Sequence, residues 1–302
     1  MVSTQFTLGN QVGWYHTNSV DYGHFHTYDN LKLGDDTRKV QVFLPNDYEH
    51  REERYPVIYM NDGNTAFYSG GLSQWSWEVD KTLDFLFNKH IIQKVIVVAV
   101  YPVDRVGEYL TNDQYFKYNS KKLGESKGVA GYSDYLALKL KKFIDEYYFT
   151  DPNPAKTTII GSSFGGTAAL YIASKYPEKF GIAGAMSGSF PMFIPVEALS
   201  DSEDEYILCK SEYMDKVDEF LSAAEIKPKL WIDWGKYETS MTITNPLIVE
   251  HMIKEHNYVK NNNLFYMEDP LGQHDERAWQ YRFNLFLAQF YPRYEQSTSD
   301  DA

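Results

Sequence analysis

Ser163 is the residue whose surroundings point most directly to chemistry. It lies in Gly161-x-Ser163-x-Gly165, after the apolar, β-branched run 157–160 and before the Ala-rich run 167–173. A strand, a sharp turn and a helix in this order lift a serine hydroxyl above a sheet edge. The glycines suit that turn because a Cβ would meet the crowded backbone around the serine. A glycine-rich packing turn would have the same spacing, so a nucleophile also requires a base, an acid and oxyanion donors elsewhere.

A base and an acid follow later in the chain. A serine hydroxyl needs a base within hydrogen-bond reach, and the base needs a carboxylate that fixes its tautomer. Glu238 follows one predicted strand, and His274 follows the last one. Carboxyl ends of parallel strands meet at one sheet edge, where reactive loops gather. The order serine, acid, histidine is that of α/β-hydrolases. Asp233, within a strand, and Asp269, after the last strand, are alternatives for the acid.

The remaining histidines are placed less favourably for catalysis. His24 and His26 alternate as on one strand face, but no cysteine or carboxylate cluster completes a metal site there, so an edge strand is the better interpretation. Four others fall in a charged turn, after a helix, or inside or at the end of a helix: His50, His90, His251 and His256. We expect no metal and no other cofactor in the reaction.

Two backbone amides could hold the developing oxyanion. One belongs to Phe164, directly after the serine, and the other to Asn64, in the glycine-bearing loop that follows the buried strand 55–60. Nearby polar and aromatic residues are candidate substrate contacts, namely Asp62, Trp75, Trp77 and Phe190. Aromatics make up 16% of the chain, which we attribute mainly to packing, with an aromatic-lined cleft as the alternative.

Strands alternate with helices through most of the chain. Apolar or alternating runs predict strands at 38–45, 55–60, 94–100, 157–160, 181–188, 229–234 and 263–267. Helical spacing predicts helices at about 75–88, 133–148, 164–175, 212–224, 245–256 and 276–290, with Ser73 and Ser133 as caps for the first two. This order predicts an α/β fold with a mainly parallel central sheet, helices on both faces and an antiparallel N-terminal edge.

We expect one domain. Residues 1–36 are polar and aromatic and form an edge segment, residues 37–292 form the α/β-hydrolase domain, and residues 293–302 form a flexible tail. Residues 101–131 are expected to be a polar loop that walls a cleft, and the segment around Met192 and Phe193 to overhang it.

Charge and composition exclude several classes of function. The chain of 302 residues has a formal net charge of −13, which argues against nucleic acid and anionic membranes as partners. Its single cysteine, Cys209, excludes an intrachain disulfide and a multi-cysteine zinc site. No apolar run reaches the roughly 18 residues of a membrane span. We expect a cytoplasmic protein, or a secreted one if a signal peptide has been removed, and the sequence does not fix its oligomeric state.

Several stretches resemble the Putative esterase family of α/β-hydrolases, which includes esterase D-like, enterochelin-type, feruloyl and acetylxylan esterases and mycolyltransferases. They are 54–63, 161–166, 176–181 and 272–279, supported by 77–80 and 143–145. The resemblance covers about residues 38–291. It implies Ser163 as nucleophile, His274 as base, Glu238 as acid and the Asn64 amide as an oxyanion donor. Asn61 departs from the hydrophobic residue common in the family, and 188–212 matches no family pattern.

These features together predict a serine carboxylic-ester hydrolase that works through an acyl-enzyme. The alternatives are acyl transfer to an alcohol by the same triad, and a non-catalytic binding protein that keeps the fold. The expected substrate is a small-molecule or carbohydrate-linked ester. The acidic charge and the aromatic loops favour a neutral or aryl-bearing ester over a polyanion.

Overall fold

The structure is a computed structural model and describes residues 3–17, 23–50, 52–70, 74–119, 127–190 and 212–293. Several predicted features lie outside these residues: the Ser73 cap, the segment around Met192 and Phe193, Cys209, and the tail from residue 294 onward. Among the described helices, none has the length and apolar character needed to cross a membrane.

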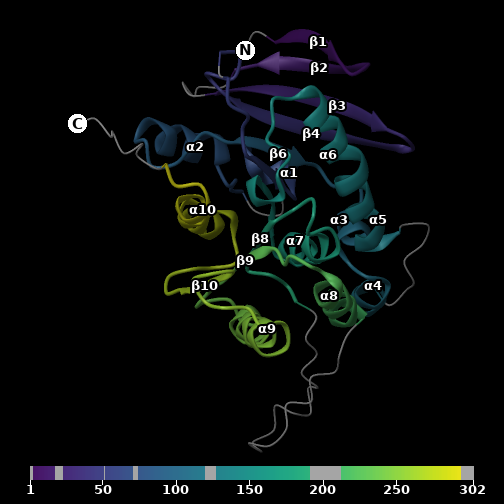
Figure 1. Ribbon diagram of the computed structural model, residues 1–302, viewed down its shortest axis with the longest axis vertical. Helices are drawn as coiled ribbons and strands as arrows, with labels where there is room; N and C mark the ends of the chain where they lie inside the picture. Colours follow the sequence, from purple (N-terminus) through teal and green to yellow (C-terminus); the bar gives the residue numbers. More distant parts are fainter. Residues whose placement is uncertain are drawn as a thin grey trace, which may run out of the picture.

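One ten-stranded sheet forms the centre of the molecule (Figure 1), in the order β1-β2-β3-β4-β6-β5-β7-β8-β9-β10. Its first four strands pair antiparallel, and β4 pairs antiparallel with β6. From β6 to β10 all neighbours are parallel. The strands are β1 (Thr4–Leu8), β2 (Gln11–His16), β3 (Gly23–Leu33), β4 (Asp36–Pro45), β5 (Val57–Met60), β6 (Ile96–Val100), β7 (Thr157–Ser162), β8 (Ile182–Met186), β9 (Lys229–Gly235) and β10 (Leu264–Asp269). The predicted parallel sheet with an antiparallel N-terminal edge is confirmed.

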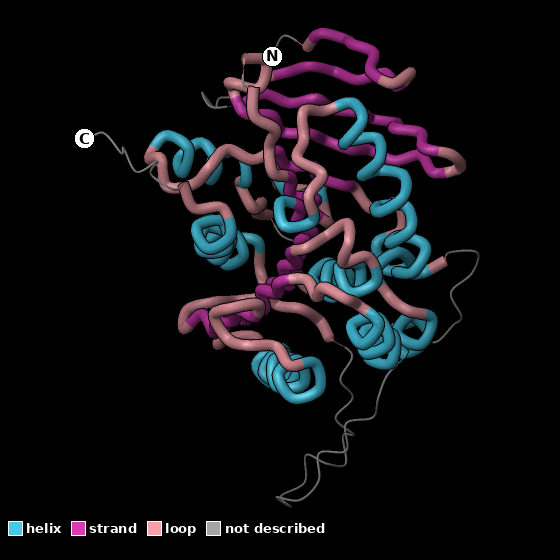
Figure 2. Tube along the Cα trace, viewed as in Figure 1, coloured by secondary structure: helices cyan, strands magenta, loops and turns pink. Residues whose placement is uncertain are grey.

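Helices cover both faces of this sheet, as the tube in Figure 2 shows. They are α1 (Gly63–Ala66), α2 (Val79–Asn88), α3 (Arg105–Tyr109), α4 (Asn112–Asn119), α5 (Gly128–Asp134), the π-helical η1 (Tyr135–Leu140), α6 (Lys141–Tyr147), the 3₁₀ turn η2 (Pro154–Lys156), α7 (Phe164–Lys175), α8 (Glu212–Ala223), α9 (Met241–His256) and α10 (Glu276–Phe290).

Two apolar cores result, one on each face. Side chains alternate between the two faces along β5. Val57 and Tyr59 pack in the core under α5 to α9, and Ile58 and Met60 pack in the core under α2 and α10. Both faces of the central strands are therefore buried, which explains their continuous apolar sequence. The carboxyl ends of these strands carry the loops of the candidate site.

The structure corrects some helix boundaries. Residues 101–131, expected as a loop, contain α3, α4 and part of α5, which are short and weakly apolar and so give little periodic signal. Ser133 lies inside α5 and donates back to the Val129 carbonyl instead of capping a helix. Helix α2 begins at Val79 and not near Trp75. Helix α9 begins four residues before Asn245, with Pro246 inside it.

Candidate active site

Ser163 occupies the sharp turn between β7 and α7. Its φ of 55° and ψ of −126° are strained for a residue with a side chain. Two backbone contacts hold this conformation: the Ser163 amide donates to the Met186 carbonyl at 2.9 Å, and the Ser163 carbonyl accepts from the Gly166 amide at 3.1 Å. The next residue, Phe164, is the first of α7, so its amide belongs to the helix end whose N–H groups lack intrahelical partners.

The glycines around the serine are required by close packing. A Cβ on Gly161 would lie 2.6 Å from the carbonyl carbon and oxygen of Gly165. A Cβ on Gly165 would lie 2.9 Å from Oδ2 of Asp62. Both distances are shorter than carbon can tolerate, so the turn and the loop after β5 can approach only through glycine.

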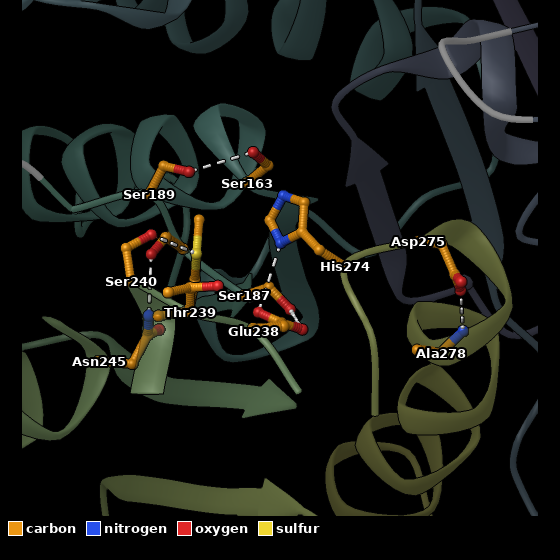
Figure 3. A network of polar contacts seen from close by, with 12 residues as sticks. Ser163, Ser187, Ser189, Glu238, Thr239, Ser240, Asn245, His274, Asp275 and Ala278 are labelled. Carbon is orange, nitrogen blue, oxygen red and sulfur yellow. Dashed lines mark hydrogen bonds and ion pairs between the residues drawn. The ribbon is translucent and has the colours of Figure 1, made fainter. Parts of the chain in front are cut away.

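His274 and Glu238 lie beside this turn, although they come from loops far apart in sequence. Nδ1 of His274 is 3.3 Å from Oε2 of Glu238. Figure 3 shows the imidazole between Glu238 and Ser163, with its other ring nitrogen on the side of the serine. The Ser163 hydroxyl contacts Oγ of Ser189 at 3.1 Å. The carboxylate of Glu238, the imidazole of His274 and the hydroxyl of Ser163 thus follow one another in that order across the site.

The two alternative acids have other partners. Asp233 is fully buried and accepts from the Trp231 indole at 2.6 Å and from the Ser187 amide at 3.3 Å. Asp269 accepts from the Leu271 amide at 3.0 Å, and so fixes the turn after β10. Of the three carboxylates, Glu238 is the one that contacts His274.

Glu238 is held by a buried polar network. Its Oε1 accepts from the Ser187 hydroxyl at 2.6 Å and from Nη2 of Arg282 at 3.3 Å. Ser187 in turn accepts from the Trp279 indole at 2.9 Å and from Nη2 of Arg282 at 2.8 Å. The Trp279 ring packs edge-on against the His274 ring, with centroids 5.1 Å apart. One serine hydroxyl therefore links the carboxylate to the side chains that support it and the histidine.

Arg282 lies between two buried carboxylates. Its guanidinium is fully buried, 3.2 Å from Asp233 and 3.3 Å from Glu238. Burial raises the pKa of Asp233 to about 6, against the lowering effect of Arg282 and with a further raising effect of Glu238. A single arginine shared by two carboxylates does not offset the cost of burying the charge of Asp233.

The loop after β5 forms the opposite side of the site. Asp62 has a left-handed φ of 55° and receives both Nε and Nη2 of Arg105, at 2.7 and 2.8 Å. Asn61 donates to the Gly165 carbonyl at 2.8 Å and accepts from the Tyr132 hydroxyl at 2.9 Å. Asn61, the departure from the family pattern, thus ties this loop to the serine turn. The Asn64 amide lies in the single turn of α1 that starts here.

A cleft of about 670 Å³ opens above the serine. Its lining includes Asp62, Asn64, Arg105, Ser163 and His274. The described residues with charged side chains that line the cleft include one arginine, Arg105, and two carboxylates, Asp62 and Glu276.

The three predicted aromatic contacts do not line this cleft. Trp77 is 1% exposed and packs against Trp279, so it supports the site from the core, and its predicted substrate contact is corrected. Phe190 is also buried, against Tyr213. Trp75 is exposed, with Arg277 over its ring at 4.6 Å. The volume of Trp77 and Phe190 is used to fill the core instead.

Sequence reasoning missed Ser187, Ser189 and Arg282. Ser187 and Ser189 follow β8, and no local motif marks the end of that strand as part of the site. Arg282 could have been identified from sequence, because it falls on the buried face of α10 with Trp279 and Phe286. A charged residue on an apolar stripe needs a buried partner.

A known protein family matches most of this chain. The family model described as Putative esterase matches residues 32–290. The uncharacterized protein YbbA of Bacillus subtilis is 24% identical over 162 residues, which cover 51% of this chain and 57% of the relative, so the match spans little more than half of that relative's length.

Solved structures of similar fold include esterases. A ferulic acid esterase superposes with a TM-score of 0.63 at 16% identity, over 89% of this chain and 98% of its own. The ferulic acid esterase AmCE1/Fae1A from Anaeromyces mucronatus, in complex with ferulic acid, gives a TM-score of 0.58 at 23% identity, over 90% and 92% of the two chains. These likenesses show the α/β-hydrolase fold.

The family match extends over most of the chain and includes the serine turn, the Glu238 loop and the His274 loop. It supports an enzyme of the esterase class, and the resemblance inferred from sequence motifs is confirmed. The chain belongs to the Putative esterase family.

Proposed function

We propose that the protein is a serine carboxylic-ester hydrolase in which Ser163 is the nucleophile, His274 the general base and Glu238 the acid. The observation that carries this proposal is the contact of His274 with buried Glu238 beside the strained turn of Ser163. Strain at a serine between glycines, with a histidine and a carboxylate in line, is what activation of a hydroxyl requires.

Acylation begins when Oγ of Ser163 attacks the ester carbonyl carbon and its proton passes to Nε2 of His274. The hydroxyl of Ser189, 3.1 Å away, can donate to Oγ of Ser163 while Ser163 donates to the imidazole. Glu238 accepts from Nδ1–H and stabilises the imidazolium. The amides of Phe164 and Asn64 donate to the carbonyl oxygen as it becomes an alkoxide. Collapse of the tetrahedral intermediate expels the alcohol, which takes the proton from His274.

Deacylation repeats these steps with water. His274 removes a proton from a water molecule, whose oxygen attacks the acyl carbon, and then returns the proton to Oγ of Ser163 as the acid leaves. The excess of carboxylates over arginine in the cleft favours a neutral ester, either a small molecule or one linked to a carbohydrate. Arg105 donates from Nε and Nη2 to the two carboxylate oxygens of Asp62, so its charge is already paired, which supports the same choice.

Replacement of Ser163 tests the proposal. Ser163→Ala should abolish hydrolysis of a short-chain p-nitrophenyl ester and labelling by a fluorophosphonate. The neighbouring Ser189→Ala is the matched control, because it removes a hydroxyl from the same turn region yet should keep labelling and most of the activity. Wild-type activity in Ser163→Ala, or a label that maps to another residue, would show that the assignment is wrong.

A further inference from the structure

Three side chains with metal-binding atoms meet outside the active site. Asp218 lies on α8, His251 on α9, and His256 is the last residue of α9. Nε2 of each histidine is 2.7 Å from the same oxygen, Oδ1 of Asp218. All three candidate ligand atoms lie within 4.8 Å of one another. Helices α8 and α9 pack side by side here (Figure 1).

The two histidine rings converge although they lie five residues apart on α9. Residues five apart on a helix point about 140° away from each other at about 100° per residue, so regular helical geometry would separate them. His256 is the last residue of α9 and is followed by Asn257 with a left-handed φ of 55°. Lys227 donates to the His256 carbonyl at 2.7 Å. The side chains of both histidines nevertheless reach one carboxylate oxygen, and their ring centroids lie 5.6 Å apart.

The donor set matches a known kind of site. Two imidazole nitrogens and a carboxylate oxygen are ordinary ligands of Zn²⁺, with bonds of about 2.0–2.2 Å. In a tetrahedral site such bonds place the ligand atoms about 3.4 Å apart. Asp218 would have to withdraw by less than an ångström from each ring, and the two Nε2 atoms, within 4.8 Å of each other, would have to lie about 3.4 Å apart. The Asp218 side chain is 20% exposed. His251 is 14% and His256 4% exposed, so the ion would be largely shielded.

We propose that Asp218, His251 and His256 bind one Zn²⁺ ion that joins α8 to α9, with water as the fourth ligand. Zinc is preferred because its filled d shell imposes no geometry, which suits ligands drawn from a helix end and a neighbouring helix. The ion replaces two hydrogen bonds to one carboxylate oxygen with three metal bonds.

This site lies away from the candidate active site and is not proposed to take part in ester hydrolysis. His251 is ten residues beyond Met241, which places it about 15 Å along α9 from the helix start near Glu238. The proposal therefore stands independently of the proposed esterase activity. Its expected effect is on stability, since an ion that binds only the folded chain raises the free energy of unfolding.

Zinc titration of the full chain tests the proposal. The protein is stripped with EDTA, dialysed, and titrated with Zn²⁺ in competition with a chromophoric chelator. One equivalent should bind with an affinity that competes with the chelator, and the thermal midpoint should rise. His251→Ala and His256→Ala should each weaken binding by more than the roughly 100-fold that loss of an outer-shell partner costs.

Two further variants control for misfolding and for other histidines. Asp218→Asn retains an oxygen that can accept from both rings, so it should fold like the wild type, by circular dichroism and by ester hydrolysis, yet lose zinc affinity. His50→Ala removes an exposed histidine far along the chain and should bind zinc normally. No stoichiometric binding by the wild type, or equal binding by wild type and Asp218→Asn, would overturn the proposal and leave a hydrogen-bonded clip between the helices.

Discussion

Ser187→Ala removes one buried hydroxyl that touches three members of the candidate site. Its Oγ donates to Glu238 at 2.6 Å and accepts from Trp279 at 2.9 Å and Arg282 at 2.8 Å. The substitution changes no charge and adds no atom. Its effect should therefore come from the lost hydrogen bonds alone.

The loss of stability comes from the polar groups that lose Ser187 as their hydrogen-bond partner. The Trp279 indole N–H loses its acceptor in the core, and an unsatisfied buried donor costs about 1–3 kcal/mol. Arg282 keeps its 3.3 Å contact with Glu238, so its loss is at the lower end of that range. We expect a decrease of about 2–4 kcal/mol in the free energy of unfolding. Because Trp279 packs on His274, kcat/KM should also fall, by about 10- to 100-fold, or about 1.4–2.7 kcal/mol.

Urea unfolding and ester hydrolysis measure the two effects. The matched control is Ser174→Ala, which removes a buried hydroxyl that donates only to the Leu170 carbonyl of its own helix. That loss leaves no donor unsatisfied and should cost about 1 kcal/mol or less, with activity unchanged. If Ser187→Ala were no less stable than Ser174→Ala and hydrolysed the ester at the wild-type rate, the network would not support the site as argued.

Three other substitutions have definite expected outcomes. Glu238→Gln should lower kcat roughly 10³- to 10⁴-fold, because an amide no longer fixes the imidazole tautomer, and a fall below tenfold in the pH-independent rate would exclude it as the acid. Asp233→Asn should remove a pH dependence of the free energy of unfolding. Because the pKa of Asp233 in the folded chain, about 6, lies above its unfolded value, the wild type loses stability as pH rises from about 4 to 6. Relative to wild type, the variant should gain up to about 3 kcal/mol across that range in urea titrations, and a constant difference would contradict the raised pKa. Gly161→Ala places a Cβ 2.6 Å from the Gly165 backbone, so it should destabilise by several kcal/mol, about 3 or more, and a variant with wild-type urea midpoint would refute the close packing.

Long periodic elements could be predicted from sequence, and short ones could not. The strand before Ser163 and helix α10 lie where the apolar pattern places them, because both bury a continuous face. Helices α3 and α4 have five and eight residues with little apolar periodicity, and tertiary contacts decide them. The predicted helix 245–256 begins at Asn245, whereas the first turn of α9 forms ahead of Pro246 through the Ser240 carbonyl, which accepts from the Thr244 amide.

The residues of the candidate site likewise include some that could be predicted from sequence and some that could not. Ser163, Glu238 and His274 could be named because strand ends and chain order restrict where such residues fall. Their support could not, because Ser187 and Arg282 are separated by 95 positions and belong to no motif. Asn61 also shows the limit, since its role depends on the carbonyl of Gly165, 104 positions away. Contacts of this range are set by packing and leave no local pattern.

The position of α10 late in the sequence determines when the site can be completed during synthesis. More than one hundred residues separate Ser163 from Arg282, so at 5–20 residues per second a ribosome takes roughly 6–24 s to make the intervening chain. During that time the serine turn can form, but Trp279 and Arg282 do not yet exist. A nascent chain would therefore carry its proposed nucleophile without the side chains that support the site until α10 docks. The first hydrolysis of ester in a synchronised translation reaction would time that docking.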